Sequence, residues 1–272
     1  MISGEIGKLA GLIKTGAVKI GENLNLGYWL PISQSTEDIL KLFRLENGLD
    51  RALSSPDVKR METYLRSVNK YKRKNKMSVL GVFSAYYGDD AVATVLVSAQ
   101  RTKKSESKFQ TILQLRNAQL SGWLKDDESV DDVFRLLKLH TDGYSALGSP
   151  KLEALDYYMK MFNREKSGQE TLLQVLTNGF DGEHNLAKLL IRAKKDPRTS
   201  ELANAMENAL LNKWLSSKSR PVDVLKMLKL NEYMDEALLD PTYHTFYLDV
   251  QRKKSPYQNV IDRDIYQELW GR

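Results

Sequence analysis

The sequence predicts an all-α protein assembled from tandem helical-bundle repeats. Two observations lead to this fold class: a Trp-Leu segment occurs three times at nearly constant spacing, and apolar residues follow helical spacing after each copy. The tryptophans are Trp29, Trp123 and Trp214, which lie 94 residues (123 − 29) and 91 residues (214 − 123) apart. A long, nearly fixed period is typical of chains that stack one structural module on the next.

Each copy contains an apolar stripe at positions i, i+3, i+4 and i+7, which is one face of an α-helix. The helix start is marked in the first two copies, since Ser35 precedes Asp38, and Ser129 precedes Asp132, by three residues. A serine at the cap and an acid in the first turn both suit the positive end of a helix. The stripes are Thr36, Ile39, Leu40 and Phe43 in the first copy, Val130, Val133, Phe134 and Leu137 in the second, and Pro221, Val224, Leu225 and Leu228 in the third.

A second helical pattern follows each stripe after a proline, at Pro56, Pro150 and Pro241. Within it Tyr64 and Tyr158 occupy matching positions, whereas the third copy departs from the pattern. Large aromatic side chains dominate core energetics, so we expect the repeated aromatics to fill the core between helices rather than to contact a ligand. The predicted structural core residues are Trp29, Trp123, Trp214, Tyr64, Tyr158, Leu139 and Leu230.

A third kind of segment occurs twice, at 78–100 and at 171–194. Each copy has a short apolar helix, a glycine (Gly88 or Gly182) and a second helix. We expect the glycine to take the left-handed conformation that often ends helices. The distance from this glycine to the next tryptophan is 35 residues (123 − 88) in the first copy and 32 (214 − 182) in the second. The first copy therefore has three extra residues, which we place in a loop at 101–107.

These segments predict three units along the chain. Residues 1–76 contain a leading amphipathic helix and the first Trp unit, residues 77–168 the second unit, and residues 169–272 the third unit with a C-terminal tail. The longest uncharged apolar-rich run, 78–88, is too short to span a bilayer, so no membrane segment is predicted.

Composition limits the chemistry. The chain has no cysteine, which excludes a disulfide scaffold, a Cys-ligated zinc site and a cysteine nucleophile. Its three histidines, His140, His184 and His244, occupy different positions of the repeat and form no His-x-x-x-His pair, so no metal site or catalytic triad is predicted. No glycine-rich phosphate loop is present. We therefore predict no catalytic residue, no cofactor and no enzyme activity.

Basic clusters are the stronger functional signal, although the net charge of +6 is modest and does not require a nucleic acid. The run at 70–76 is read either as a nuclear-import or nucleic-acid patch or as cations that complement the C-terminal end of a helix. Lys103 and Lys104 match Lys194 and Lys195 at an offset of 91, which favours a solvated loop. The candidate partner-binding residues are Lys70, Lys72, Arg73, Lys74, Lys76, Arg101, Lys103 and Lys104.

Taken together, these segments resemble the tandem WY/LWY repeats of Phytophthora RXLR effectors, in the order WY1–LWY2–LWY3. The resemblance covers nearly the whole chain after residue 27, although no signal peptide and no Arg-x-Leu-Arg motif are present, so we expect the leader to be missing from this sequence. The W-type motif matches 29–45, 123–139 and 214–230, the Y-type motif matches 56–69, 150–163 and weakly 241–251, and the L-type motif matches 78–100 and 171–194.

The resemblance implies three-helix WY and five-helix LWY units linked end to end into an elongated rod. It also implies a monomeric protein that the pathogen secretes and that acts in the host cytoplasm or nucleus by binding a host protein. One subset of the family docks onto the scaffold A subunit of host protein phosphatase 2A and redirects the phosphatase, which is the leading hypothesis. The alternative is suppression of RNA silencing through nucleic-acid-linked binding by the basic run and Tyr71, although single-strand binding usually needs more aromatic residues.

Overall fold

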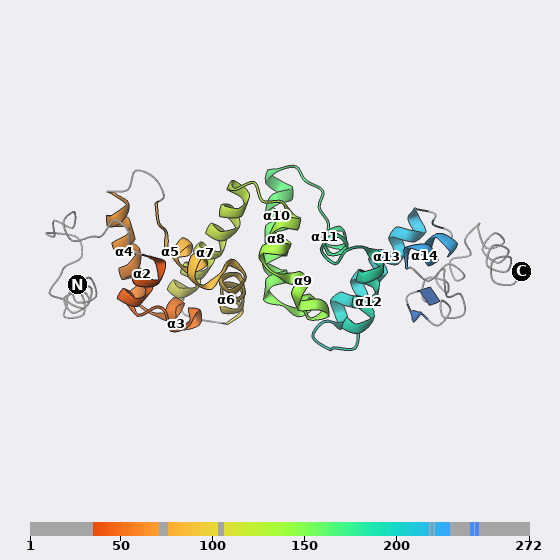
Figure 1. The fold of residues 1–272 in the computed structure, drawn as a ribbon, viewed down its shortest axis with the longest axis horizontal. Helices are drawn as coiled ribbons and strands as arrows, with labels where there is room; N and C mark the ends of the chain where they lie inside the picture. The colour runs from red at the N-terminus through yellow and green to blue at the C-terminus, as the bar shows by residue number, and fades with distance from the viewer. Residues whose placement is uncertain are drawn as a thin grey trace, which may run out of the picture. The chain divides into compact units, whose positions relative to one another are not determined.

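A computed structural model describes residues 35–70, 76–102, 106–217, 219, 221–228, 240, 241, 243 and 244 (Figure 1). Throughout these ranges the regular structure is helical and no strand occurs, which confirms the all-α prediction. Trp29 and Leu230 lie outside the described residues. The elongated rod stays a prediction.

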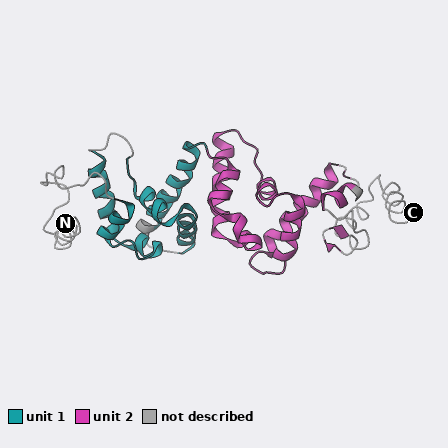
Figure 2. Cartoon of the chain, viewed as in Figure 1, with its two compact units in different colours: residues 1–127 teal, residues 128–272 magenta. Residues whose placement is uncertain are grey.

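The chain divides into two compact units, residues 1–127 and 128–272 (Figure 2). Each unit combines a stripe helix and a Y-type segment with the L-type helix pair that follows them. The unit boundary cuts the second W-type segment, so that Trp123 belongs to unit 1, and unit 2 also contains the third W-type segment. The packing unit therefore differs in phase from the repeat read in the sequence, whose division at 76 and 168 stays a prediction. Unit 1 contains α2 (Thr36–Phe43), α3 (Leu49–Ser54), α4 (Asp57–Asn69), α5 (Val79–Tyr87), α6 (Asp89–Arg101) and α7 (Glu106–Lys125).

Unit 2 repeats this order of helices. Its first helix, α8, is followed by a short α9 and a 3₁₀ helix, η1, where unit 1 has only α3. Its helices are α8 (Val130–Leu136), α9 (Leu139–Asp142), η1 (Gly143–Gly148), α10 (Pro150–Glu165), α11 (Leu172–Gly179), α12 (Glu183–Ala193), α13 (Ser200–Ser216) and α14 (Pro221–Met227).

The equivalent helices α2 and α8 begin with the predicted caps. Ser35 Oγ accepts a hydrogen bond from the Asp38 amide at 3.1 Å, and Ser129 Oγ accepts one from the Asp132 amide at 3.1 Å. In both helices the aspartate carboxylate in turn accepts a hydrogen bond from the serine amide, which completes a capping box. The hydroxyl and then the amide of Ser129 lower the pKa of the Asp132 carboxyl below its usual value.

The C-terminal ends of the same two helices explain why the W-type motif closes with a basic residue followed by leucine. Arg44 and Lys138 have φ angles of 57° and 54°, in the left-handed region. After Arg44, the Leu45 amide donates to the Leu40 carbonyl at 2.9 Å, and Leu45 is buried. This is a Schellman ending, in which an apolar residue after the left-handed position packs back onto the helix. The basic residue and the leucine that close the W-type motif therefore mark the end of α2 and of α8.

The prediction of a left-handed conformation for the glycine between the paired helices is wrong. Gly88 has φ 88° and ψ 150°, and Gly182 has φ 106° and ψ 170°. The left-handed helical region lies near ψ of about 47°, whereas these values fall in or near a region that essentially only glycine adopts. The reason is that each glycine also serves as the N-cap of the next helix, so its carbonyl must already point along that helix.

The three extra residues of the first copy lie in helices and not in the loop at 101–107. Helix α6 has 13 residues and α12 has 11. Trp123 is the 18th residue of α7, while Trp214 is the 15th residue of α13 (123 − 105 and 214 − 199). The connection after α6, at 102–105, is two residues shorter than the one after α12, at 194–199. Hydrophobic spacing gave the total length correctly but could not locate the helix ends.

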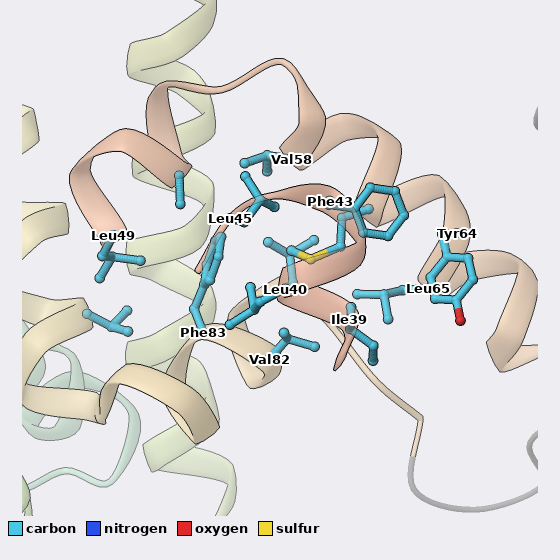
Figure 3. Close-up of a cluster of buried hydrophobic side chains, with 14 of the residues drawn as sticks. Ile39, Leu40, Phe43, Leu45, Leu49, Val58, Tyr64, Leu65, Val82 and Phe83 are labelled. Carbon is cyan, nitrogen blue, oxygen red and sulfur yellow. The ribbon is translucent and has the colours of Figure 1, made fainter. Parts of the chain in front are cut away.

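In unit 1 the apolar stripe of α2 lies at the centre of the core (Figure 3). Ile39 and Leu40 are at most 1% exposed and face α5, and Phe43 lies against Tyr64 of α4 with ring centroids 5.5 Å apart. Burial of each such side chain contributes about 1.5–3 kcal/mol. The stripe of α8 is buried in the same way in unit 2.

Candidate interaction surface

The two repeated tryptophans that the structure describes, Trp123 and Trp214, are buried in the core. Trp214 is 1% exposed, and its indole Nε1 donates to Glu183 Oε2 at 2.6 Å. The other oxygen of Glu183 accepts a hydrogen bond from Lys213 Nζ at 2.7 Å. Trp123 is 6% exposed. Because both rings are covered, neither offers its surface to a partner.

The matched tyrosines are buried as well. Tyr158 is 0% exposed, and its hydroxyl donates to the Glu128 carbonyl, while Tyr64 is 7% exposed. Burial raises the pKa of Tyr64 to about 12, because the ionised phenolate would lose its hydration. Leu139 is also 0% exposed. These residues hold the helices of each unit together.

An asparagine at the end of α4, and its counterpart on α10, each close the connection that follows. Asn69 Nδ2 donates to the Met77 carbonyl at 2.6 Å, and the Met77 amide donates to Asn69 Oδ1 at 2.8 Å. Asn163 makes the same two bonds with Glu170, at 2.8 and 3.0 Å. We call each pair of bonds an asparagine clamp. Its sequence signal was an Asn at both positions, 94 residues apart.

The clamp of unit 1 brings together the two ends of the basic run. Lys70 directly follows Asn69 and Lys76 directly precedes Met77, and both lysines are exposed. Lys72, Arg73 and Lys74 lie outside the described residues. The clamp therefore fixes where the run begins and ends.

Of the other candidate cations, the structure describes Arg101. Arg101 is exposed at the C-terminal end of α6, and Lys103 and Lys104 lie outside the described residues. In Figure 1 the C-terminal end of α4 lies at the top of unit 1 and the C-terminal end of α6 at the bottom. The ends of α4 and α6 therefore lie on opposite sides of unit 1 in this view.

The net charge of the chain is concentrated around this clamp. Residues 57–76 contain eight Lys or Arg and two Asp or Glu, a net charge of +6, which equals the +6 of the whole chain. All other residues therefore sum to zero. The equivalent stretch of unit 2, residues 151–169, has four Lys or Arg and three Asp or Glu, a net charge of +1. The basic character belongs to unit 1 and is not a requirement of the repeat.

Neither a metal site nor a membrane-spanning helix is found among the described residues. No group of three His, Asp or Glu side chains there is arranged to hold a metal ion. None of the described helices combines the length and the apolar character needed to cross a bilayer. Two large aromatic side chains in these ranges are exposed, Tyr86 on α5 at 38% and Tyr144 on η1 at 42%.

Comparison with known proteins relates the chain to one group, although no protein-family model matches it. An RxLR effector protein of Phytophthora infestans is 51% identical over 253 residues, which cover 92% of this chain and 36% of that protein. A second one is 46% identical over 274 residues, covering 100% of this chain and 52% of that protein. The RxLR effector protein PSR2 of Phytophthora sojae is 29% identical over 214 residues, covering 78% of this chain and 31% of that protein.

A solved structure gives the same relation. The crystal structure of PcRxLR12 superposes with a TM-score of 0.63 at 25% identity, covering 87% of this chain and 53% of that one. The chain thus spans about half, or less, of the length of these proteins.

Proposed function

Because the chain is a homologue of the RxLR effector proteins of Phytophthora over nearly its whole length, we propose that it works as a non-enzymatic helical adaptor that binds a host protein. In this proposal it forms part of an effector that the pathogen secretes, and it acts inside the plant cell, in the cytoplasm or the nucleus, to suppress immunity.

One observation carries the proposal: buried and capping positions are shared by the two units, while the exposed side chains differ. The capping boxes, the left-handed helix ends and the asparagine clamps recur in both units. The net charge of the sequence around the clamp changes from +6 at 57–76 to +1 at 151–169. A repeat with a constant core and a variable surface is suited to recognising a specific partner.

The partner we propose is the scaffold A subunit of protein phosphatase 2A. Support comes from the resemblance of the unit order to the phosphatase-binding subset of the family. The geometry is also compatible, because the A subunit is a curved helical solenoid and helix bundles can lie across its repeats. Binding to it would redirect the phosphatase.

The test is a pull-down of purified A subunit, without the catalytic subunit, by the intact chain. Two variants locate the contact: Lys70→Glu with Lys76→Glu at the clamp, and Arg101→Glu with Lys103→Glu and Lys104→Glu after α6. Charge reversal is preferable to shortening residues 101–107, because the extra residues lie in the helices. No binding by the intact chain rejects this partner; loss in one variant only assigns the surface.

A second candidate function is suppression of RNA silencing through the basic run. The observation that favours it is the density of cations at 70–76, next to Tyr71. A contact with RNA phosphates should weaken steeply as salt rises. Absence of RNA binding to the intact chain at low salt rejects this candidate.

A further inference from the structure

One side of α4 presents a row of cations. Lys59, Arg66 and Lys70 follow one another at intervals of seven and four residues, which places them on one face of the helix. Their Cα atoms are spaced by about 10 Å and about 6 Å along the axis, at roughly 1.5 Å per residue. The clamp holds Lys76 at the end of the same helix. All four residues are exposed, and we call them the basic face.

The fold does not require these cations. The position equivalent to Lys59 in unit 2 is Glu153, at the offset of 94 that relates the two asparagine clamps. Helix α10 forms, packs and ends in its own clamp with that acid in place. Unit 2 keeps a cation at the positions of Arg66 and Lys70, namely Lys160 and Arg164, but has Gln169 before its clamped backbone where unit 1 has Lys76. Lys59 and Lys76 are therefore the cations of the basic face that distinguish unit 1, and packing offers no reason for them.

The cations are also available to a partner. The ion pairs that α4 side chains form with other described residues are Arg60–Asp57 at 2.8 Å and Arg66–Glu62 at 2.9 Å. The side chains of Arg66 and Glu62 are 69% and 55% exposed, and ion pairs in such positions contribute little to stability. Arg66 can therefore exchange Glu62 for an acid of a partner at small cost.

The arrangement favours a protein over a nucleic acid. Glu62, which pairs with Arg66, stands beside the cations of the basic face and would repel an unbroken row of phosphates, whereas a protein segment can place a neutral or basic side chain opposite it. Single-stranded nucleic acid also needs exposed aromatic rings for stacking. The exposed aromatic rings of the described residues, Tyr86 and Tyr144, lie on other helices.

A membrane surface fits less well too. Stable attachment of a helix to a bilayer combines cations with large apolar side chains that enter the lipid. In the described part of α4 the apolar residues Val58, Met61 and Leu65 are buried in the core of unit 1. The exposed side of the helix therefore offers charge without an apolar anchor.

We propose that the basic face of α4 binds an acidic segment of the partner protein. This inference rests on the proposed function, since it names the chemistry that the adaptor recognises. The clamp lowers the entropic cost of binding, because it fixes Lys76 relative to α4 before the partner arrives.

The experiment measures binding of a fluorescent peptide of repeating Glu-Ser-Asp-Ala to the intact chain by fluorescence anisotropy. A peptide with Gln and Asn in place of the acids is the control ligand. We expect binding of the acidic peptide alone, weakening as salt rises. The combined variant Lys59→Glu, Lys70→Glu and Lys76→Glu should weaken it about tenfold or more. The matched variant Lys160→Glu, Arg164→Glu and Lys166→Glu on the α10 side should leave the dissociation constant unchanged.

Several results would overturn the inference. It fails if the acidic peptide does not bind, if the two triple variants lose affinity equally, or if the α4 variant binds normally. It also fails if single-stranded RNA, duplex RNA or phosphatidylserine vesicles bind more tightly than the peptide at physiological salt and are lost in the same variant. A pull-down of the phosphatase A subunit on the same samples separates the claims: A-subunit binding without peptide binding removes only this inference, and the reverse removes only that partner.

Discussion

Substitution of Gly179 by alanine adds one methyl group to the core of unit 2 and so tests how tightly that core is packed. A Cβ at this position would lie 2.3 Å from Phe134 Cε1 and 2.5 Å from its Cζ, far inside van der Waals contact. Phe134 is 1% exposed and packs edge-on against Phe180 with ring centroids 5.4 Å apart, so the ring has little room to move. Overpacking of this kind costs about 1–3 kcal/mol. Helix propensity alone predicts the opposite, a gain of up to about 1 kcal/mol.

Unit 1 has different residues at the two equivalent positions. Counted from the N-caps Ser78 and Thr171, the residue equivalent to Gly179 is Tyr86, eight residues on in both helices (86 − 78 and 179 − 171). The residue equivalent to Phe134 is Leu40, at the offset of 94. Unit 1 therefore combines a smaller core residue with a larger residue on the facing helix, and unit 2 does the reverse.

A double-mutant cycle measures this complementarity. We expect Gly179→Ala to destabilise the protein by about 1–2 kcal/mol once the helix-propensity gain is subtracted. Phe134→Leu should destabilise it by a similar amount through lost burial. The double variant should be less destabilised than the sum, with a coupling of about 0.5–3 kcal/mol. Denaturant unfolding followed by circular dichroism gives these values; a neutral or stabilising Gly179→Ala, or simple additivity, would refute the reasoning.

Three further predictions follow from the buried and clamped residues. Trp123→Ala should cost about 3–5 kcal/mol through the cavity it leaves; near-wild-type melting would mean that the ring is exposed in solution. Asn69→Ala should speed amide exchange of Met77 and leave the clamp of Asn163 protected, as hydrogen–deuterium exchange can show; unchanged exchange would mean that the clamp does not form. Burial raises the pKa of Tyr64 to about 12, whereas the unfolded pKa is about 10. The contribution of Tyr64 to the free energy of unfolding is therefore complete below pH of about 10 and falls by roughly 2–3 kcal/mol as the pH rises from about 10 to about 12. Tyr64→Phe should remove this alkaline loss in a pH series of unfolding curves, and an unchanged pH profile would contradict the assignment.

Much of the fold is visible in the sequence because its signals are local. The stripes of α2 and α8 and their serine caps depend on spacings of three and four residues, which one helix fixes by itself. The site of the extra residues was placed wrongly, because apolar spacing does not show where α6 ends and α7 begins. The contact between Phe134 and Gly179 could not be predicted from the sequence, since it depends on how two helices are aligned against each other.

The candidate surface was only partly predictable, for a similar reason. The density of charge at 70–76 is plain in the sequence, and so is the matching Asn at positions 69 and 163. That the asparagine reaches across the connection to a backbone seven or eight residues away is a tertiary fact. Likewise, the sequence does not show how far apart the C-terminal ends of α4 and α6 lie, whereas the fold places them at the top and the bottom of unit 1 in Figure 1.

The central claim, that the chain is an adaptor for the phosphatase A subunit, is tested most directly by mixing it with purified A subunit and measuring the mass of the eluting species by light scattering after size-exclusion chromatography. The account predicts a single species whose mass is the sum of one copy of each protein, formed without the catalytic subunit and weakened by Lys70→Glu with Lys76→Glu. Two separate peaks at the masses of the free proteins, at concentrations well above micromolar, would contradict it.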